Sequence, residues 1–568
     1  MSTVRWVPSW GGERFALVAL LCLVVLLAVV PMARLAEEAL APGGHVDLGV
    51  IGGVLKSPAV WRAAENTLTV ALGGTVLALL LGGAFALLVT LTDLRGKKPL
   101  VFCFMLPLMI APQVTALAWI DLFGPNSTLL GALGLAPPVG SQHPLYGPQG
   151  IILLLGLEQA PVVFLAVRAG LRALPRDLVE AGQAAGAKPW RIVRTIVLPL
   201  TMPSIAAGGM LAFVASIGNF GIPAFLGIPA GYTVLVTLIY QRLAGFGTSV
   251  LSEVAAISLL LALLALGGLA LNAWLARRRD VRVTAWSSAT PQWSLGRWRA
   301  IVAVSCWTLL LLVLVLPLVA LLATALVPAI GVALTPENLS FANFRFVLFD
   351  YAATRRAFFN SATLSAAAAL MLVAVSVPLG YSLVVRRAAL LRAVSFTAEL
   401  PYALPGVVLA IAMILCLLRP LPVLGFSLYS TVWIILVAYL SRFLLLALRP
   451  VTNALQQVDS SLDEAARMSG ARFARRLTTV ILPLVAPSAV AGGMLVFLTA
   501  FNELTVSALL WSSGAETVGV VLFSLEQSGD TVSAAAVAVI AVVITLAMML
   551  VANALASRVA RGVLPWQP

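Results

Sequence analysis

The most informative shortage in this sequence is charge. Only 10% of its 568 residues are Asp, Glu, Lys or Arg, whereas 61% are hydrophobic. Soluble globular domains carry about 25% charged residues. Long runs with so little charge indicate membrane-spanning helices, because about 20 apolar residues cross the hydrocarbon core of a bilayer. The composition therefore argues against a soluble enzyme or binding domain.

Histidine and cysteine are also scarce, with two and four residues in the whole chain. All four cysteines lie inside apolar runs and none has the spacing of a metal site, so we interpret them as packing residues; they are Cys22, Cys103, Cys306 and Cys416. We therefore predict no metal site and no catalytic residues. A membrane enzyme is the least favoured class.

The sequence also lacks a phosphate-binding loop of the form Gly-x-x-x-x-Gly-Lys-Ser/Thr. The basic turn Gly96-Lys97-Lys98 has no glycine at the required upstream spacing. We therefore expect that this chain does not hydrolyse ATP and holds no cofactor of its own. Any ATP-driven process would need a separate subunit.

What the sequence does contain is a long internal repeat. The stretch from Glu180 to Pro203 returns as Glu464 to Pro487, and each matching residue lies 284 positions after its counterpart, half the length of the chain. The match continues from Ala207-Gly-Gly-Met-Leu to Ala491-Gly-Gly-Met-Leu. A repeat of this length indicates a duplicated chain. We predict one half at 1–275, a basic linker at 276–299 and a second half at 300–568.

Each half contains six apolar runs, which predicts an all-α polytopic membrane protein of about twelve spanning helices. An even number of spans per half makes the two repeats parallel, with an axis along the membrane normal. The first run could instead be a signal peptide, but it is long for one. The expected helices are 15–33, 67–92, 100–122, 150–171, 204–227, 250–275, 301–328, 360–385, 395–418, 430–448, 488–511 and 532–556.

The positions of Lys and Arg predict the orientation of the chain. If the N-terminus is cytoplasmic, 28 of the 36 basic residues fall in the inner segments, Arg442 among them. The positive-inside rule therefore places both termini and both repeated stretches in the cytoplasm. The same distribution explains the net charge of +14 without a nucleic-acid partner.

The repeated stretch predicts two short helices held at the membrane surface in each half, at 175–203 and 459–487. Gly186 and Gly470 are expected to end the first helix of each pair, because glycine adopts a left-handed backbone without steric cost. Asp459 is a candidate N-cap. Small residues leave one face open to a partner, and the basic second helix would rest on lipid headgroups. The prolines at 199, 203, 483 and 487 are expected to break the helix before the chain re-enters the membrane.

The pattern Glu-Ala-x-x-x-x-Gly-Ala followed by Leu-Pro-x-x-x-Pro resembles the cytoplasmic EAA loop of type I ABC importer permeases. The first copy departs from the pattern at Gly182, where alanine is usual. The resemblance implies that both copies are coupling helices that dock in a groove of an ATPase subunit. Carried over, the docking residues would be Glu180, Ala181, Gly186, Ala187, Glu464, Ala465, Gly470 and Ala471. An ordinary amphipathic connector is the alternative, and it explains two matching copies poorly.

The resemblance covers both halves, and two halves fused in one chain resemble ferric-iron, thiamine and some phosphonate permeases. It implies two ATPase copies, which would hold ATP and Mg²⁺, and a periplasmic or lipid-anchored solute-binding protein. The expected location is the bacterial cytoplasmic (inner) membrane. We rank ferric iron first as the solute, followed by 2-aminoethylphosphonate or another phosphonate, thiamine and polyamine. A secondary transporter independent of ATP is the alternative of another class.

Polar residues inside apolar runs are the candidates for a translocation path, because intramembrane charge is costly and commonly functional. Glu503 is placed midway along the helix 488–511, and the offset of 284 pairs it with Asn219. The remaining candidates are Asn502, Glu158 and Glu399. Each could instead be hydrogen-bonded to a neighbouring helix, and Glu399 could lie near the inner interface. The prolines at 107, 112, 401 and 405 predict kinks, for hinge motion or for packing.

Overall fold

The structure is a computed structural model that describes residues 10–138, 140–245, 250–278, 293–386, 397–420 and 425–559. Over these ranges the protein is built from helices, and the only strand-like pairing is an isolated bridge between Thr92 and Trp293. In the first half the main helices are α1 (Trp10–Val24), α2 (Val30–Leu40), α3 (Gly49–Lys56), α4 (Pro58–Leu91), α5 (Lys97–Met109), α6 (Pro112–Phe123), α7 (Thr128–Ala132), α8 (Pro148–Arg172), α9 (Arg176–Ala184), α10 (Pro189–Ile192), α11 (Leu198–Gly218), α12 (Gly221–Leu226), α13 (Leu235–Leu243) and α14 (Val250–Arg278).

The second half repeats this order of elements. Its helices are α15 (Arg299–Leu310), α16 (Leu316–Ala325), α17 (Ala342–Arg345), α18 (Ala352–Arg386), a short helix Thr397–Ala403, α20 (Gly406–Leu417), α21 (Val432–Leu455), α22 (Ser460–Met468), α23 (Phe473–Arg476), α24 (Leu482–Phe501), α25 (Ser507–Leu510), α26 (Val518–Gln527) and α27 (Thr531–Val559). The helices α22 and α23 begin and end at the repeat offset from α9 and α10. The repeat in the sequence is therefore a repeat in the structure.

Ten helices are long and apolar enough to cross a membrane within the described ranges, or twelve if each of two bent pairs is one span. The bent pairs are α5 with α6 and its continuation, and Thr397–Ala403 with α20; their axes differ by 100° and 116°. The sequence predicts single kinked helices at 100–122 and 395–418. The structure instead has complete breaks just before Pro112 and Gly406, and residues 395–396 lie outside the described ranges.

The prolines at 199, 203, 483 and 487 do not end the helices in which they lie, so the prediction of helix breaks there is wrong. Residues Pro189–Gly218 and Phe473–Phe501 each run through as one spanning helix. A π turn precedes each Leu-Pro pair: the N–H of Leu198 reaches the carbonyl of Val193, and that of Leu482 reaches Leu477. One wider turn accommodates the missing proline N–H without ending the helix.

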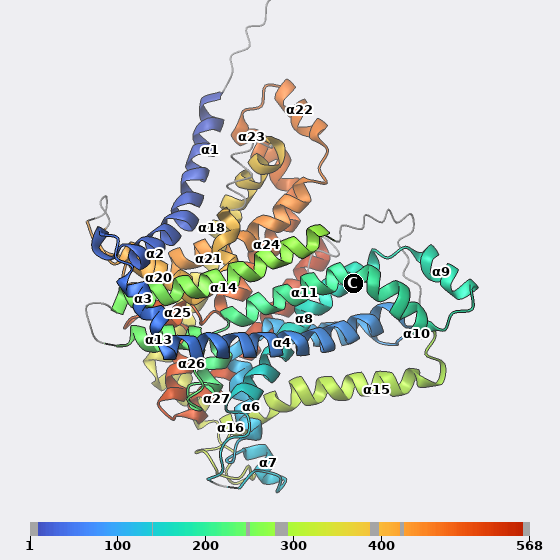
Figure 1. Cartoon of the computed structure of the whole chain (residues 1–568), viewed down its shortest axis with the longest axis vertical. Coiled ribbons are helices and arrows are strands. Elements are labelled where there is room, and N and C mark those ends of the chain that lie inside the picture. Colours follow the sequence, from blue (N-terminus) through green and yellow to red (C-terminus); the bar gives the residue numbers. More distant parts are fainter. Residues whose placement is uncertain are drawn as a thin grey trace, which may run out of the picture.

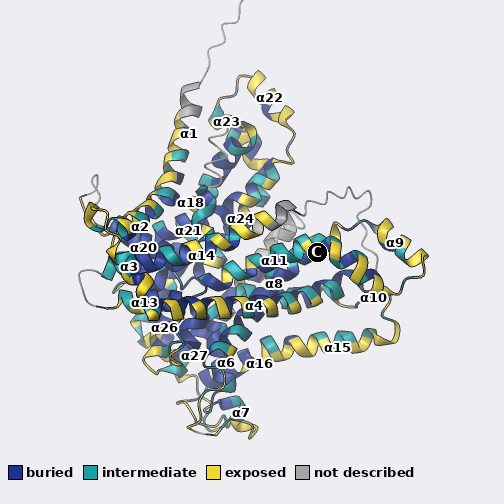
Figure 2. Cartoon of the chain, in the orientation of Figure 1, coloured by how far each residue is buried: buried dark blue, intermediate teal, exposed yellow. Residues whose placement is uncertain are grey.

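The two halves pack their long helices in the same way. In the first half α4, α8 and α11 pack against one another, and in the second α18, α21 and α24 do the same (Figure 1). Residues buried between these helices form the dark core of Figure 2. Small residues allow the close approach, since a Cβ at Gly82 of α4 would overlap the backbone of α8.

The linker expected at 276–299 is described only at its ends, because residues 279–292 lie outside the described ranges. Its final part is attached to the C-terminal end of α4. Trp293 donates its backbone N–H to the carbonyl oxygen of Leu91 at 2.7 Å, and the carboxylate of Asp93 accepts from Leu295 N at 2.9 Å. Asp93 also forms an ion pair with Arg299. The second half therefore starts from a fixed point on the first.

Candidate coupling helices and translocation path

The helices α9 and α22 form where the sequence predicts short surface helices. Gly186 and Gly470 have φ angles of 75° and 79°, so both helices end at a left-handed glycine as expected. Asp459 is the N-cap of α22, and its carboxylate accepts from Ser461 N at 2.9 Å. Hydrogen bonds from the Ser461 backbone and hydroxyl hold the pKa of Asp459 below its usual value. In α9 the N-cap is Pro175, which has no capping side chain.

The residues that the resemblance assigns to docking lie on exposed surface. Glu180, Ala181, Gly186, Glu464, Ala465 and Gly470 are exposed, and Ala187 and Ala471 are half-buried. Figure 2 shows both helices as exposed segments at separate corners of the molecule. The sequence analysis missed two exposed leucines, Leu178 and Leu462, which also lie at the repeat offset from each other. An apolar side chain at the same exposed place in each half would supply contact area to a partner.

The basic helix that follows α22 is not wholly available to lipid. Arg476 of α23 is only 4% exposed, because its guanidinium bonds to Asp463 of α22. The expectation of a lipid-facing basic surface is therefore wrong for Arg476. Arg472 and Arg475 of the same stretch are exposed.

The sequence predicts Glu503 midway along a helix and Asn219 within one, but in the structure both residues lie just beyond a helix end. Asn219 follows the end of α11, and Glu503 lies two residues beyond α24. Each buried side chain caps the next short helix instead. Asn219 Oδ1 accepts from Ile222 N at 3.1 Å, and Glu503 Oε1 accepts from Val506 N at 2.8 Å, three residues ahead in both cases. Because the apolar run continues past the break, hydropathy alone could not locate it.

Glu158 joins Asn219 in the first half. Its Oε2 accepts a hydrogen bond from Asn219 Nδ2 at 2.8 Å, on adjacent helices α8 and α11. The residue at the repeat offset from Glu158 is Arg442 of α21, which lies close enough to Glu503 to interact with it electrostatically. The two halves thus carry polar pairs at matching positions, Glu158 with Asn219 and Arg442 with Glu503.

The positive-inside pattern places Arg442 among the cytoplasmic basic residues, and the structure corrects this. It is the eleventh residue of the 24-residue helix α21, well inside the span. Its Nη1 is buried without a hydrogen-bond acceptor in the described part of the chain. A Cβ at Gly406 would overlap the guanidinium, so Arg442 rests directly on the start of α20. The constant offset between the halves is the signal that could have found it.

The two halves meet at their helix breaks. Asn502 Nδ2 donates to the carbonyl oxygen of Met109 at 3.2 Å, and Gln113 Nε2 donates to the carbonyl oxygen of Asn502 at 3.2 Å. Gly218, the counterpart of Asn502, packs against Pro405 in the opposite direction. Each half therefore packs the residue that precedes its capping side chain, Gly218 or Asn502, against the bent helix pair of the other half.

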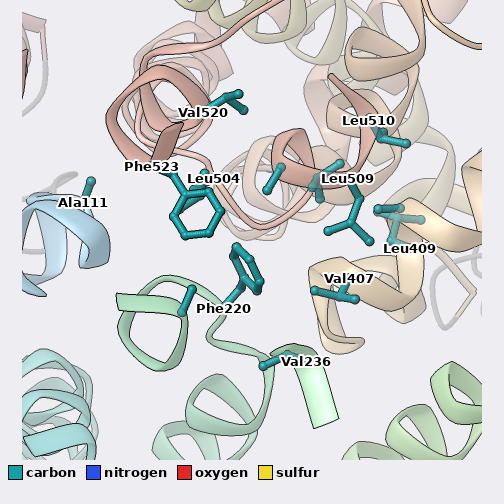
Figure 3. Packing of buried hydrophobic residues seen from close by; sticks show 14 of the residues in the cluster. Ala111, Phe220, Val236, Val407, Leu409, Leu504, Leu509, Leu510, Val520 and Phe523 are labelled. Carbon is teal, nitrogen blue, oxygen red and sulfur yellow. The ribbon is translucent and has the colours of Figure 1, made fainter. Parts of the chain in front are cut away.

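An aromatic cluster fills the space next to these contacts. Phe220 of the first half and Phe523 of the second pack edge to face with ring centroids 5.7 Å apart, and Tyr240 contacts both rings. Figure 3 shows Phe220 next to Phe523, with Val236 below Phe220 and Val407 to its right. Phe220 and Phe523 are 0% and 6% exposed, so the packing between the halves is closed here.

Glu399 lies apart from this group. Its half-buried carboxylate is 3.5 Å from Nη2 of the exposed Arg449. Among the residues that the structure describes, Glu158 and Asn219 are brought together, Asn502 bonds to the broken helix of the first half, Glu503 lies near Arg442, and Glu399 pairs with Arg449 instead.

Comparison with known proteins agrees with this architecture. The family model described as the binding-protein-dependent transport system inner membrane component matches twice, at residues 74–281 and 376–564. These two matches cover most of the chain, one in each half. The chain belongs to this family.

Several curated relatives are permeases. A probable ABC transporter permease, y4fN of Sinorhizobium fredii, is 27% identical over 89% of this chain and 87% of its own length. The Fe(3+)-transport system permease protein FbpB 2 of Haemophilus influenzae is 23% identical over 85% of this chain and 87% of its own length. The putative 2-aminoethylphosphonate permease PhnU of Salmonella choleraesuis is 28% identical over 37% of this chain and 75% of its own length. This protein is therefore an ABC importer permease with two fused halves.

In this permease, no group of three or more His, Cys, Asp or Glu side chains within the described ranges could hold a metal ion. The polar residues between the halves are instead paired carboxylates, amides and one guanidinium. Glu158 bonds to Asn219, and both carboxylate oxygens of Glu503 accept backbone N–H groups.

Proposed function

We propose that this permease moves a small solute inward across the bacterial cytoplasmic membrane, driven by two copies of a separate ATPase subunit. The observation that carries the proposal is the pair of exposed helices α9 and α22, which project at the same place in each half. Each would dock in a groove of one ATPase copy through Glu180, Ala181 and Gly186 or Glu464, Ala465 and Gly470. ATP and Mg²⁺ would be held by the ATPase subunits.

The path would follow the axis between the halves. Asn219, Glu158, Asn502 and Glu503 adjoin the helix breaks there, and Arg442 joins them. The buried cluster around Phe220 and Phe523 would be the closed gate of this state. ATP binding would draw α9 and α22 together and open the gate, and hydrolysis would reset it. A solute-binding protein, periplasmic or lipid-anchored, would deliver the solute to the outer face, and both termini would be cytoplasmic.

Ferric iron is our first candidate solute, because the relatives that match across both halves include Fe(3+)-transport permeases. A phosphonate is the second candidate, favoured by a different observation. Arg442 presents a guanidinium nitrogen with no acceptor inside the described part of the span, while both oxygens of Glu503 already accept backbone N–H groups. A phosphonate oxygen would fill that donor, since guanidinium groups bind phosphorus oxyanions well.

One assembly tests the function and the solute together. The permease and its ATPase subunit are reconstituted in proteoliposomes, with the binding protein loaded in turn with ferric iron or 2-aminoethylphosphonate. We expect one loaded form to stimulate ATP hydrolysis and to be taken up. Uptake that continues without ATP would make the protein a secondary transporter and overturn the proposal.

The docking assignment has its own test. Replacing Glu180 and Glu464 together by arginine should abolish solute uptake while the permease still folds and enters the membrane. The matched control is Glu65→Arg, since Glu65 is an exposed carboxylate of α4 away from both helices. Normal uptake by the Glu180→Arg, Glu464→Arg double variant would show that these helices do not carry the coupling.

A further inference from the structure

The coupling helix of the second half is tied to a spanning helix by a buried ionic network. Arg476 Nη1 donates to Asp463 Oδ1 and Oδ2 at 2.9 and 3.0 Å. Tyr381 of α18 donates its hydroxyl to Asp463 Oδ2 at 2.8 Å and accepts from Arg476 Nη1 at 3.1 Å. Exposure is 7% for Asp463, 4% for Arg476 and 2% for Tyr381. Three elements, α18, α22 and α23, therefore share one set of charge-assisted hydrogen bonds.

The first half has only apolar side chains at these three places. The counterparts of Asp463 and Arg476 are Val179 and Ile192, which lie at the repeat offset and are fully buried. The counterpart of Tyr381 is Leu87, which packs against the same apolar cluster as Val179 and Ile192. The offset between α4 and α18 is larger than that of the repeated stretch, and it equals the offset between the bounds of α6 and α20.

Hydrogen bonds near the N-terminal ends of α4 and α18 confirm how these two helices correspond. Asn66 Nδ2 donates to the carbonyl oxygen of Thr233, and Asn360 Nδ2 donates to that of Glu516. Thr67 accepts from Leu235 N, and Ser361 accepts from Val518 N. Tyr381 follows Leu87 by the same interval that separates these two pairs, so Tyr381 and Leu87 are true counterparts.

The two kinds of attachment transmit motion differently. Apolar contact is non-directional, so α9 can shift against α4 while its side chains stay buried. The bonds among Tyr381, Asp463 and Arg476 are directional, and moving one partner away would leave a buried charge unpaired. The network therefore holds α22 in one register against α18, whereas the apolar counterparts do not fix α9 in this way.

We propose that Tyr381, Asp463 and Arg476 form a positioning network that holds α22 rigidly against α18. Movement of the ATPase subunit bound to α22 would then displace α18 directly, so that the two ATPase copies act on the path unequally. The second half would convert ATPase movement into displacement of α18, and the first half would follow more loosely. The inference rests on the proposed docking of α9 and α22 for its functional part, but its mechanical part does not.

The chain itself supplies the test variant. The triple substitution Tyr381→Leu, Asp463→Val and Arg476→Ile gives the second half the side chains that the first half already carries. It removes the network, and Arg467, which also bonds to Asp463 and Tyr381, is exposed to solvent, so no buried charge loses its partners and the variant should fold. The single variant Asp463→Asn leaves Arg476 without its carboxylate and should assemble less well than the triple variant.

Hydrogen exchange of the full-length permease in nanodiscs tests the mechanical part. In the wild type, amides of α22 should exchange about tenfold more slowly than those of α9, since α22 opens only when the network opens. In the triple variant most of this difference should disappear, leaving only the smaller part that the Asp459 cap of α22 contributes. Equal exchange in the wild type, or an unchanged difference in the triple variant, would overturn the proposal.

The functional part is tested in proteoliposomes with the ATPase subunit and whichever of ferric iron and 2-aminoethylphosphonate the wild type takes up. The triple variant should hydrolyse ATP at a near-normal rate but move about fivefold less solute per ATP. The control is Ile192→Val with Leu87→Ile, which alters the first-half site within the apolar class and should leave that ratio unchanged. An unchanged ratio in the triple variant would overturn the inequality of the halves. Failure of the wild-type permease to bind the ATPase subunit would instead contradict the docking proposal alone, because the hydrogen-exchange test does not involve the ATPase.

Discussion

Arg442 of the second half occupies the position that Glu158 occupies in the first. Both are the eleventh residues of helices that begin at the repeat offset from each other, and the neighbours of each, Glu503 and Asn219, are counterparts as well. An acid in one half and a base at the same position of the other give the two halves unlike polar pairs. One half offers a carboxylate with an amide, and the other a guanidinium with a carboxylate.

Replacing Arg442 by glutamine should reduce solute uptake by about tenfold or more, because Glu503 would then be a buried carboxylate without a nearby cation. Arg442→Lys keeps the charge and should retain more activity than the glutamine variant. Uptake in proteoliposomes is the measurement. The control is Arg449→Gln, since Arg449 is an exposed arginine of the same helix. Equal effects of Arg442→Gln and Arg449→Gln would remove Arg442 from the path.

Much of the architecture follows from the sequence because duplication doubles the signal. One copy of the stretch around Glu180 could be an ordinary connector, but two copies at matching places in the two halves predict the paired surface helices that the structure contains as α9 and α22. Left-handed glycines at 186 and 470 are predictable for the same reason. Charge-poor runs locate the spanning helices because burial in lipid requires apolar side chains.

The errors have physical causes of their own. Apolar residues continue past the ends of α11 and α24, so hydropathy places Asn219 and Glu503 inside helices rather than at their caps. A π turn before Pro199 keeps the helix intact, and side-chain pattern does not show such a turn. The sequence pattern assigns Arg442 to the cytoplasm because basic residues near helix ends usually lie there. Its pairing with Glu503 depends on the packing of α21 against α24, which sequence order does not reveal.

Glu503→Gln should lower the stability of the purified permease by about 1–3 kcal/mol, because one carboxylate oxygen that accepts a backbone N–H is replaced by an amide group that cannot. Both Glu503 oxygens are used, one by Val506 N and the other by Ser507 N. Thermal unfolding in detergent measures the loss. The matched variant Asn219→Asp keeps the acceptor that caps α12 and should lose less. A neutral Glu503→Gln would show that the cap does not stabilise this junction.

Gly186→Ala and Gly470→Ala should each cost about 1–2 kcal/mol at the ends of α9 and α22, because L residues are strained at positive φ. No atom lies within 4 Å of a Cβ built at either site, so strain is the whole effect and no clash contributes. The affinity of the permease for its ATPase subunit should fall accordingly. Gly83→Ala is the control, since Gly83 lies within α4 with open space around it and should tolerate alanine. If all three variants bind the ATPase equally, the glycine caps do not shape the docking surface.

Phe523→Ala should open a leak between the halves. Phe523 is 6% exposed and contacts Phe220, Phe225 and Tyr240 of the first half, so its loss removes contacts that only the paired halves can make. The resulting cavity should cost about 3–5 kcal/mol, and solute or small ions should cross proteoliposomes without ATP. Phe85→Ala is the matched control, because Phe85 is 7% exposed but packs on Phe104 and Phe164 within the first half alone. It should cost similar stability and cause no leak, because its cavity lies within one half. A leak in both variants would point to general loosening of the bundle, and a tight Phe523→Ala would place the gate elsewhere on the axis.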